Sequence, residues 1–327
     1  MIPFRSALAV FALSAAVPTA FAAVTITQQP DKVRVEIDGK LFTEYVFTGA
    51  PHVYFYPVLG PGGAKMTRDW PMQNPPGEEH DHPHHRSLWF AHGAVNDIDF
   101  WAEPPSFGSG KGHPTGEIRH DQFLEVKGGD QQGVIKDQLK WVAPDGSMPL
   151  TSVQTFRVYQ RPENERLFDF EVALTAGAKD VIMGDTKEGS MAMRLAESMR
   201  LELPKKQPGQ GHIVDDQGQR DNDVWGKHAS WVDYSGPIDG KTLGVAFFDH
   251  PQNPRHPTRW HARDYGLFAA NPFCEHEMDK SKPAGTGDFK IPAGQTVTFR
   301  YRVLIHEGDA AAAKVADRYA EYIKDTK

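Results

Sequence analysis

Short runs of alternating apolar and polar residues, separated by turn residues, dominate the chain and constrain its fold more than any other feature. Val33–Ile37 alternates in this way, Asp38-Gly39 follows, and Leu41–Phe47 completes a predicted hairpin. Further runs of this kind occur at Val53–Leu59, Gln122–Val126, Gly133–Val142, Thr151–Arg157, Leu167–Leu174, Leu195–Leu203, Thr242–Phe248 and Thr296–Ile305. The sequence therefore predicts an all-β, mainly antiparallel fold, a large β-sandwich or supersandwich.

One helix is expected, at the C-terminal end. Asp309 can cap it, and the apolar positions that follow keep helical spacing to about Lys324. The segments Arg68–Pro83, Pro104–Pro114 and Lys205–Asn222 read as loops, because proline, glycine and polar residues interrupt them. Long ordered loops on a β scaffold often carry functional residues.

Residues 1–22 have the features of a secretory signal peptide. A basic start at Arg5 precedes an apolar stretch, and Ala20-Phe21-Ala22 supplies the small residues of a cleavage site after Ala22. We therefore expect residues 23–327 to form a single exported β-sandwich domain, periplasmic or secreted and without a membrane anchor. The single cysteine, Cys274, excludes an internal disulfide.

The net charge of −7 argues against nucleic acid as a partner. A carbohydrate or another small polyhydroxylated ligand suits this composition better.

Five of the 15 histidines lie between His80 and His92. If this run is a strand, His84, Arg86 and His92 share one face and can line a site, while His85 and Trp89 share the other face. Histidine at this density indicates acid-base chemistry, a metal or a hydrogen-bonded structural cluster around an arginine.

The spacing of His82 and His84 also suits a divalent metal, with a carboxylate as the third ligand. Whether a cofactor is bound is left open at this point.

Three further segments combine ionisable and aromatic residues. Asp97 and Asp99 precede Trp101, and such carboxylates either split their pKa values for catalysis or cap a turn. Glu188 follows Lys187 between glycines and is a candidate acid, base or metal ligand, or one half of a solvated ion pair. The third segment runs from His250 to Asp264; its prolines predict a rigid loop, and His261 and Arg263 alternate onto one face if the chain there is extended.

These blocks together resemble an exported bacterial family known as "methane oxygenase PmoA-like". The matching stretches are Asp81–Arg86 with Leu88–Phe90, Val95-Asn96 with Asp99–Trp101, Gly184–Gly189, Val224–Lys227, Asp249–Pro251, Asn253–Pro257 and Arg263–Pro272. Ser87 departs from the pattern, which has glycine at that position. The resemblance implies a β-sandwich, similar by analogy to the galactose mutarotase-like supersandwich that hosts sugar epimerases, lyases and hydrolases. Methane oxidation is not carried over, because a membrane monooxygenase subunit needs several membrane-spanning helices.

The sequence thus predicts an exported carbohydrate-active enzyme that uses His and Glu side chains for acid-base chemistry. A non-catalytic periplasmic glycan-binding protein is the alternative. The candidate catalytic residues are His84, His85, Arg86, Glu188, His261, Arg263 and Asp264; the candidate substrate-binding residues are Trp89, His92, Asp99, Trp101, His250, His256 and Trp260; the candidate metal ligands are His82 and His84. Arg86 and Arg263 are expected to stabilise negative charge, and the tryptophans to stack on sugar rings.

Overall fold

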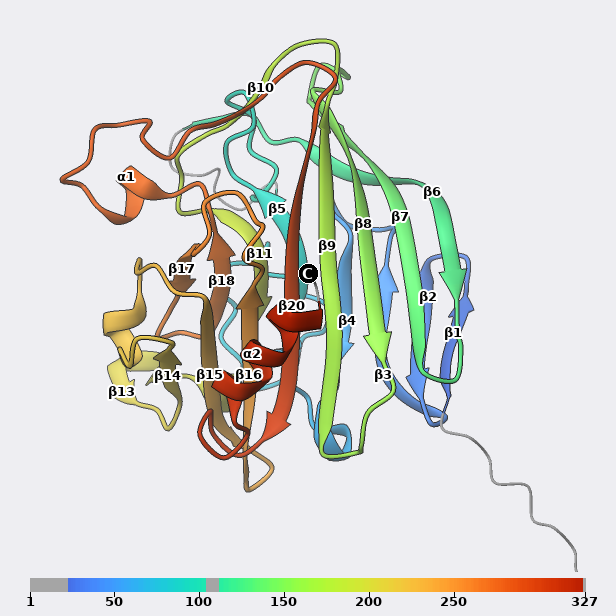
Figure 1. The fold of residues 1–327 in the computed structure, drawn as a ribbon, viewed down its shortest axis with the longest axis vertical. Coiled ribbons are helices and arrows are strands. Elements are labelled where there is room, and N and C mark those ends of the chain that lie inside the picture. Colours follow the sequence, from blue (N-terminus) through green and yellow to red (C-terminus); the bar gives the residue numbers. More distant parts are fainter. Residues whose placement is uncertain (1–22, 104–111, 326–327) are drawn as a thin grey trace, which may run out of the picture.

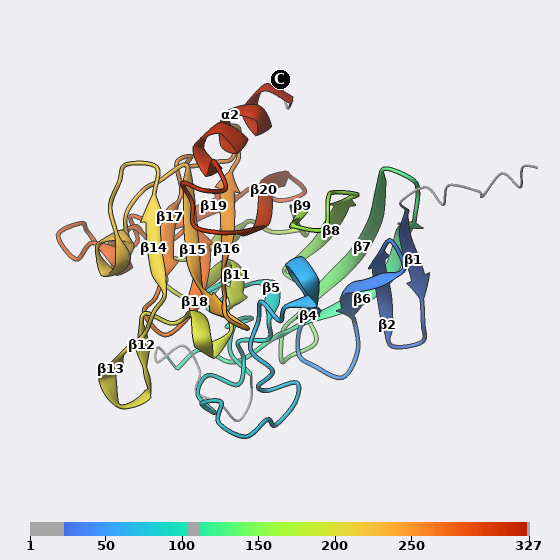
Figure 2. The ribbon, with the colours of Figure 1, turned by 90° about the horizontal axis from the view of Figure 1, so that it is seen from below.

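Two eight-stranded antiparallel sheets face each other in the computed structural model, which describes residues 23–103 and 112–325 (Figures 1 and 2). The all-β prediction is therefore confirmed. The expected signal peptide, residues 1–22, lies outside the described residues, as do residues 104–111 of one expected loop. Within the described part of the chain, no helix has the length and apolar character needed to cross a membrane.

The first sheet, called the site sheet here, contains in spatial order β1 (Val24–Gln28), β2 (Lys32–Ile37), β3 (Lys40–Val46), β4 (Tyr54–Val58), β5 (Leu88–His92), β11 (Gly189–Arg194), β18 (Leu267–Asn271) and β17 (Arg259–Ala262). The second sheet, the back sheet, contains β14 (His212–Asp215), β15 (Trp231–Ile238), β16 (Lys241–Asp249), β20 (Thr296–Glu307), β9 (Glu165–Ala176), β8 (Leu150–Tyr159), β7 (Gln132–Val142) and β6 (Glu117–Lys127).

In residues 23–103 and 112–325, the smaller elements are two strand pairs, two α-helices and four short 3₁₀ turns. They are β10 (Val181–Met183) with β19 (Phe289–Ile291), β12 (Glu202–Leu203) with β13 (Gln207–Pro208), α1 (Glu275–Met278), α2 (Val315–Asp325), and the 3₁₀ turns Pro61–Gly63, Glu197–Met199, Pro204–Lys206 and Asp221–Val224.

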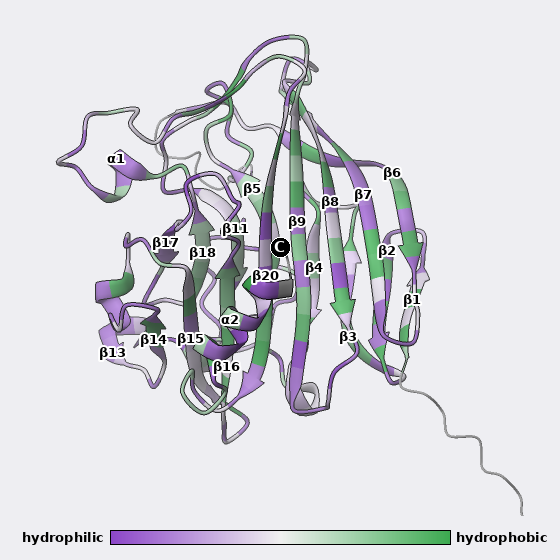
Figure 3. Cartoon of the chain, viewed as in Figure 1, coloured by the Kyte–Doolittle hydropathy of each residue, from purple (hydrophilic) through white to green (hydrophobic). Residues whose placement is uncertain are grey.

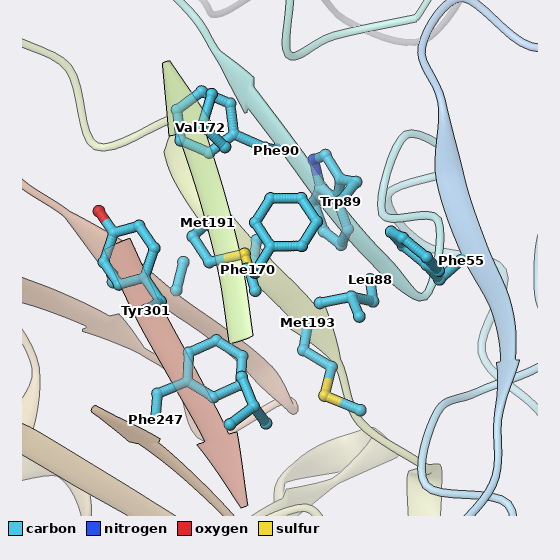
Figure 4. Close-up of a cluster of buried hydrophobic side chains, with 14 of the residues drawn as sticks. Phe55, Leu88, Trp89, Phe90, Phe170, Val172, Met191, Met193, Phe247 and Tyr301 are labelled. Carbon is cyan, nitrogen blue, oxygen red and sulfur yellow. The ribbon is translucent and has the colours of Figure 1, made fainter. Parts of the chain in front are cut away.

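The core lies between the two sheets and draws on both. In Figure 4, Met191 and Met193 of β11 lie near Phe170 of β9 and Phe247 of β16, and all four are buried. Hydropathy alternates along strands of the back sheet such as β9 (Figure 3), as expected for strands with one face in the core and one in water. Apolar burial on this scale is the main force that holds such a sandwich together.

The predicted hairpin is confirmed as β2–β3, and Asp38 and Gly39 take the positive φ angles that a primed turn requires. Two predicted boundaries are wrong. The C-terminal helix begins at Val315 and not near Asp309, because Asp309 accepts the backbone N–H of Ala312 and caps a separate preceding turn. The run 195–203 forms a 3₁₀ turn and a two-residue strand, since the strand at this point in the chain is β11, directly before it.

Four neighbouring strands, β5, β11, β18 and β17, position the candidate residues. Their register places Trp89, Ala192, Ala269 and His261 in one cross-strand row. Because side chains alternate along a strand, this row faces away from the core that Met191 and Met193 enter. The long loop between β4 and β5 lies on the side of the molecule opposite α2 (Figure 2), so it covers this outer face.

Candidate functional site

The histidine run is mostly a loop, and its strand begins only at Leu88. His84 and Arg86 therefore do not share a strand face with His92, and that part of the sequence prediction is wrong. Leu88, Phe90 and His92 take the core-facing side of β5. The Nε2 of His92 lies 2.8 Å from the carbonyl of Gly184, and its ring packs against a buried phenylalanine, so His92 does not line the outer face.

An ion-pair network, called the arginine network here, holds this loop to the sheet. Arg194 of β11 donates through Nη2 to both carboxylate oxygens of Asp81 at 2.9 and 3.0 Å, and Arg68 donates to the same carboxylate. Burial alone would raise the pKa of Asp81, but the hydrogen bond with His82 and the charges of the two arginines hold that pKa well below its usual value. Both arginine side chains are fully buried, so the network is structural.

A group of stacked rings, the ring cluster, lies beside the arginine network. It consists of His52, His82, His84, His85, Trp89 and Trp101, whose ring centroids lie 4.5 to 6.5 Å apart in each contacting pair. Trp89 and Trp101 are each 1% exposed. The expectation that they form sugar-stacking platforms is therefore wrong, because neither ring presents a face to solvent.

Two histidines of the ring cluster, His84 and His85, are held neutral. Burial, followed by the charges of neighbouring groups, lowers the pKa of His84 to about 3 and the pKa of His85 well below its usual value. Arg194 donates through Nη1 to Nδ1 of His85 at 3.1 Å, so the proton of the neutral His85 ring is on Nε2. His85 therefore cannot accept a proton at Nε2.

Arg86 forms a bidentate pair with Glu103, with Nε–Oε1 at 2.5 Å and Nη2–Oε2 at 2.8 Å. Its charge is therefore already matched by a carboxylate. This arrangement favours the structural interpretation of Arg86 over a role in stabilising charge on a substrate.

A second group of polar side chains, the outer cluster, gathers around the end of β17. His261 extends from the outer face of β17, and Arg263 follows directly after the strand. The Arg263 guanidinium lies 5.5 Å from the ring centre of Trp225 and 5.2 Å from that of Tyr265. Lys187 and Glu188, from the segment before β11, complete the cluster, with Nζ and Oε1 4.0 Å apart.

Tyr265 joins the two clusters. Its ring stacks on His82 with centroids 5.2 Å apart and planes 6° apart, and His82 in turn stacks on His85 at 4.7 Å. The histidine run and the segment that ends at Asp264 therefore meet on one face of the site sheet. The charge of His82 contributes to the pKa of both Glu188 and His261, as expected for neighbouring groups.

Glu188 differs from the other carboxylates in this region. Its side chain is 21% exposed, and among the described residues its carboxylate makes no hydrogen bond; Lys187 at 4.0 Å is its ion-pair partner. Burial raises the pKa of Glu188, and the positive charges of Lys187, His82 and Arg263 offset part of that rise. A carboxyl group with a raised pKa and no hydrogen bond is not fixed by a protein donor and is suited to exchange its proton with a substrate.

His261 is poised as a hydrogen-bond donor. Trp225 donates its indole N–H to Nδ1 of His261 at 3.0 Å, which places the ring proton on Nε2. Burial, followed by the charges of Arg263 and Lys187, lowers the pKa of His261 well below its usual value. His261 is therefore neutral, and within the described residues its Nε2 has no hydrogen-bond partner.

Several predicted residues lie outside the outer cluster. Trp260 alternates with His261 as expected, but it faces the core and donates its indole N–H to the carbonyl of Ala229. His250 accepts a backbone N–H through Nδ1, and His256 Nδ1 pairs with Asp249 at 2.7 Å. The substrate-binding role expected for these three residues is therefore replaced by packing and internal hydrogen bonds.

The two remaining carboxylates are also accounted for. Asp99 is fully buried, and its Oδ1 accepts the backbone N–H groups of Trp101 and Ala102, which is the turn-capping alternative. Asp264 lies beside Arg263, with Oδ1 and Nε 3.8 Å apart, and its backbone carbonyl supports the chain at Leu201.

The sequence did not single out Trp225 and Tyr265 as site residues, nor Arg68 and Arg194 as ionic partners of the histidine run. Trp225 is 37% exposed, and its indole both orients His261 and contacts Arg263. The sequence around Trp225 shows only an aromatic residue followed by a glycine and a lysine, in a segment without strand character. This pattern alone is a weak indication of a functional residue.

The described residues do not supply a metal site. No three of their His, Cys, Asp or Glu side chains are grouped as ligands of one ion would be. The rings of His82 and His84 lie 5.7 Å apart at a steep angle, and His82 Nδ1 pairs with Asp81. The donor set expected from their spacing is therefore incomplete.

A cavity of about 700 Å³ lies elsewhere, between β14, β15 and the turn before α2. Its lining includes Ile213, Trp231, Thr242 and Val315, and none of the predicted site residues.

The model of the family described as "Family of unknown function (DUF6807)" matches residues 32–320, so the chain belongs to this family. No curated protein matches the chain. Among solved structures, the chain is similar at 10% identity and a TM-score of 0.23 to a 4-alpha-glucanotransferase from Thermococcus litoralis. That match covers 87% of this chain and only 38% of the glucanotransferase, and likeness at this level carries no functional argument.

Proposed function

We propose that this member of a family of unknown function is an exported enzyme that moves a proton on a carbohydrate, with Glu188 as the proton carrier. The observation that carries the proposal is the Glu188 carboxylate, which has a raised pKa and no hydrogen bond among the described residues. Structural carboxylates in proteins are normally hydrogen-bonded when they are this enclosed. A carboxyl group with a perturbed pKa and a single long ion pair, in the same cluster as a neutral histidine, is typical of a catalytic site.

The neighbours of Glu188 suit a reaction in which negative charge develops on a substrate oxygen. Glu188 takes a proton from a carbon next to a carbonyl or carboxyl group, and the electron pair of the broken C–H bond moves to that oxygen. His261 Nε2–H, Arg263 and Lys187 supply a donor and two positive charges for this oxygen. The intermediate then regains a proton, as in an epimerase, or expels a neighbouring substituent, as in a lyase.

The same geometry gives less support to a hydrolase. Glycoside hydrolysis generally needs two carboxyl groups that flank the bond to be broken. Asp99 is the carboxylate whose charge contributes to the pKa of Glu188, and it is fully buried and caps a turn. We therefore place the reaction among the epimerase and lyase types.

A carbohydrate is the proposed substrate class because Trp225 offers a partly exposed indole ring next to the polar groups. An aromatic face beside hydrogen-bonding groups suits a sugar ring, whose C–H face stacks and whose hydroxyls bond. The exported location rests on the signal peptide expected at residues 1–22.

Proton exchange tests the proposal directly. The purified protein is incubated in D₂O with a panel of neutral and acidic oligosaccharides, and proton NMR follows the loss of sugar C–H signals and the appearance of products. Wild type should exchange a C–H proton in at least one sugar, and Glu188→Gln should lower that rate by about 10²–10⁴-fold. The matched control is Glu125→Gln, an exposed position on β6, which should keep the wild-type rate.

Trp225 also supports a second candidate, a glycan-binding protein without turnover. In that case a glycan binds wild type and Glu188→Gln equally well in calorimetry, and no sugar in the panel exchanges a proton or yields a product. That result would overturn the enzymatic proposal.

A further inference from the structure

Four nitrogen atoms in the ring cluster have no hydrogen-bond or ion-pair partner in the described part of the structure. They are Nδ1 of His84, Nε2 of His85, Nε1 of Trp89 and Nε1 of Trp101. Each of these residues is less than 8% exposed. Buried polar atoms are nearly always paired in folded proteins, so four unpaired atoms in one contacting group of rings indicate a site for another molecule.

Three of the four atoms carry a hydrogen. An indole nitrogen can only donate, which applies to Trp89 and Trp101, and His85 has its proton on Nε2 because Nδ1 accepts from Arg194. The three rings are in mutual contact, with centroid distances of 4.9 Å between the indoles and 5.4 and 5.8 Å from His85 to each of them. The missing partner must therefore supply acceptors.

The charge balance beside the ring cluster favours a negative partner. Arg68 and Arg194 both bind the single carboxylate of Asp81, so two guanidinium groups share one hydrogen-bonded carboxylate. Both arginines contribute to the lowered pKa of His84 and His85, in addition to burial, which shows that positive potential reaches these rings. A carboxylate offers two oxygens with several acceptor positions and has no proton of its own to place.

We propose that the donors of His85, Trp89 and Trp101 bind a carboxylate of the substrate, which makes the substrate an acidic carbohydrate. This inference rests on the proposed function, because it places a second recognition point next to the outer cluster. His82 links the two, since its ring contacts both His85 and Tyr265, and its side chain is 42% exposed.

The indole N–H signals of the seven tryptophans allow the donors to be observed one by one. In ¹⁵N-labelled protein, D-glucuronate and acetate are titrated as acidic probes, with D-glucose and the methyl ester of glucuronate as neutral controls. The signals of Trp89 and Trp101, assigned by substitution with Phe, should move saturably with the acids and stay unmoved with the neutral sugars. The signals of Trp141 and Trp260 should stay still, because these indoles already donate to Ser152 and Ala229.

Substitution gives the matching affinity test. Trp89→Phe and Trp101→Phe keep an aromatic ring but remove the N–H, and each should weaken glucuronate binding by about 10- to 100-fold, as expected for a hydrogen bond to a charged group. Trp70→Phe makes the same chemical change in a ring that stacks on His80, outside the ring cluster, and should bind as wild type does.

Two results would overturn the inference. One is an absence of movement of both indole signals with either acid. The other is equal movement with the acids and the neutral sugars.

The test of the acidic ligand can fail independently of the test of the proposed function, because movement of the indole signals requires no turnover. If a neutral glycan exchanges a proton and neither acid moves the indole signals, only the proposal of an acidic substrate is refuted. Acid binding at the indoles without proton exchange in any sugar would refute only the enzymatic proposal.

Discussion

Asp81 and Glu188 both lie on the outer side of the site sheet, yet their surroundings are opposite. Asp81 accepts hydrogen bonds from Arg68 and Arg194 and pairs with His82, and its pKa is held well below its usual value. Glu188 has Lys187 at 4.0 Å and a raised pKa. A carboxylate whose acceptor positions are filled fixes the structure around it, whereas one whose oxygens are free can exchange protons.

The same contrast applies to the two arginines that the sequence nominated. Arg86 is bound at two points by Glu103, so its charge is matched within the protein. Arg263 lies against two aromatic rings, and its nearest carboxylate atom, on Asp264, is 3.8 Å away. The partners of Arg86 and Arg263 therefore distinguish the two groups, although the residue type is the same.

The largest effect on stability is expected from Asp81→Asn. This change removes the negative charge between two fully buried guanidinium groups, and breaking a buried ion pair in this way costs about 3–5 kcal/mol. Glu188→Gln should leave stability unchanged or slightly higher, since it removes a charge that burial disfavours. Urea unfolding of both variants measures the difference, and an Asp81→Asn protein as stable as wild type would show that the arginine network is not structural.

The sequence predicts the fold where apolar and polar residues alternate strongly along a strand. It does not predict the strands beneath the candidate site. β2, β3, β8, β9 and β20 carry regular apolar positions and were predicted. β11, β18 and β17 were missed because the sequences Gly-Ser-Met-Ala-Met-Arg, Leu-Phe-Ala-Ala-Asn and Arg-Trp-His-Ala show no clear period. Their outer faces hold mostly small or polar residues, so the regular apolar pattern of a strand is missing there.

The candidate site was predicted in part for a similar reason. Glu188, His261 and Arg263 were nominated from local chemistry, and they lie together. Local chemistry could not show that Trp89 and Trp101 are covered, or that Arg86 has a partner 17 residues further along the chain. Burial and long-range pairing depend on the loop between β4 and β5, and no single-sequence pattern specifies its path.

Asp137 sharpens the contrast with Glu188, because burial raises its pKa to about 6 although Tyr45 and His120 both hydrogen-bond to it. The folded protein thus retains a proton on Asp137 up to about pH 6, whereas the unfolded chain releases it near pH 4. Stability should therefore fall by about 3 kcal/mol as the pH rises from 4 to 6.

Asp137→Asn should flatten this part of the stability curve in urea unfolding at a series of pH values, and proton exchange on substrate should remain at the wild-type rate. Loss of turnover in this variant would mean that a raised pKa alone, without free oxygens, is enough to mark a catalytic carboxyl group.

A smaller effect is expected from Trp225→Ala, which removes the exposed aromatic face of the outer cluster. Loss of a stacking contact costs about 0.5–1.5 kcal/mol, so KM should rise about two- to tenfold. The control is Trp231→Ala, a partly buried tryptophan at the cavity near α2, which should leave KM unchanged. If both variants behave alike in substrate titrations, Trp225 does not contact the sugar.

The smallest expected effect concerns Arg263 and the pH profile of turnover. Burial is the main cause of the raised pKa of Glu188, and the positive charges of Lys187, His82 and Arg263 hold it down in part. Arg263→Gln removes one of these charges, so the pKa of Glu188 should rise further. Glu188 acts as a base when it is deprotonated, and the acidic limb of the kcat profile should therefore move to higher pH. Arg300→Gln, which breaks an exposed pair with Glu171, is the control and should leave the limb in place. A limb that stays still in Arg263→Gln, or moves to lower pH, would mean that Arg263 does not act on the charge of Glu188.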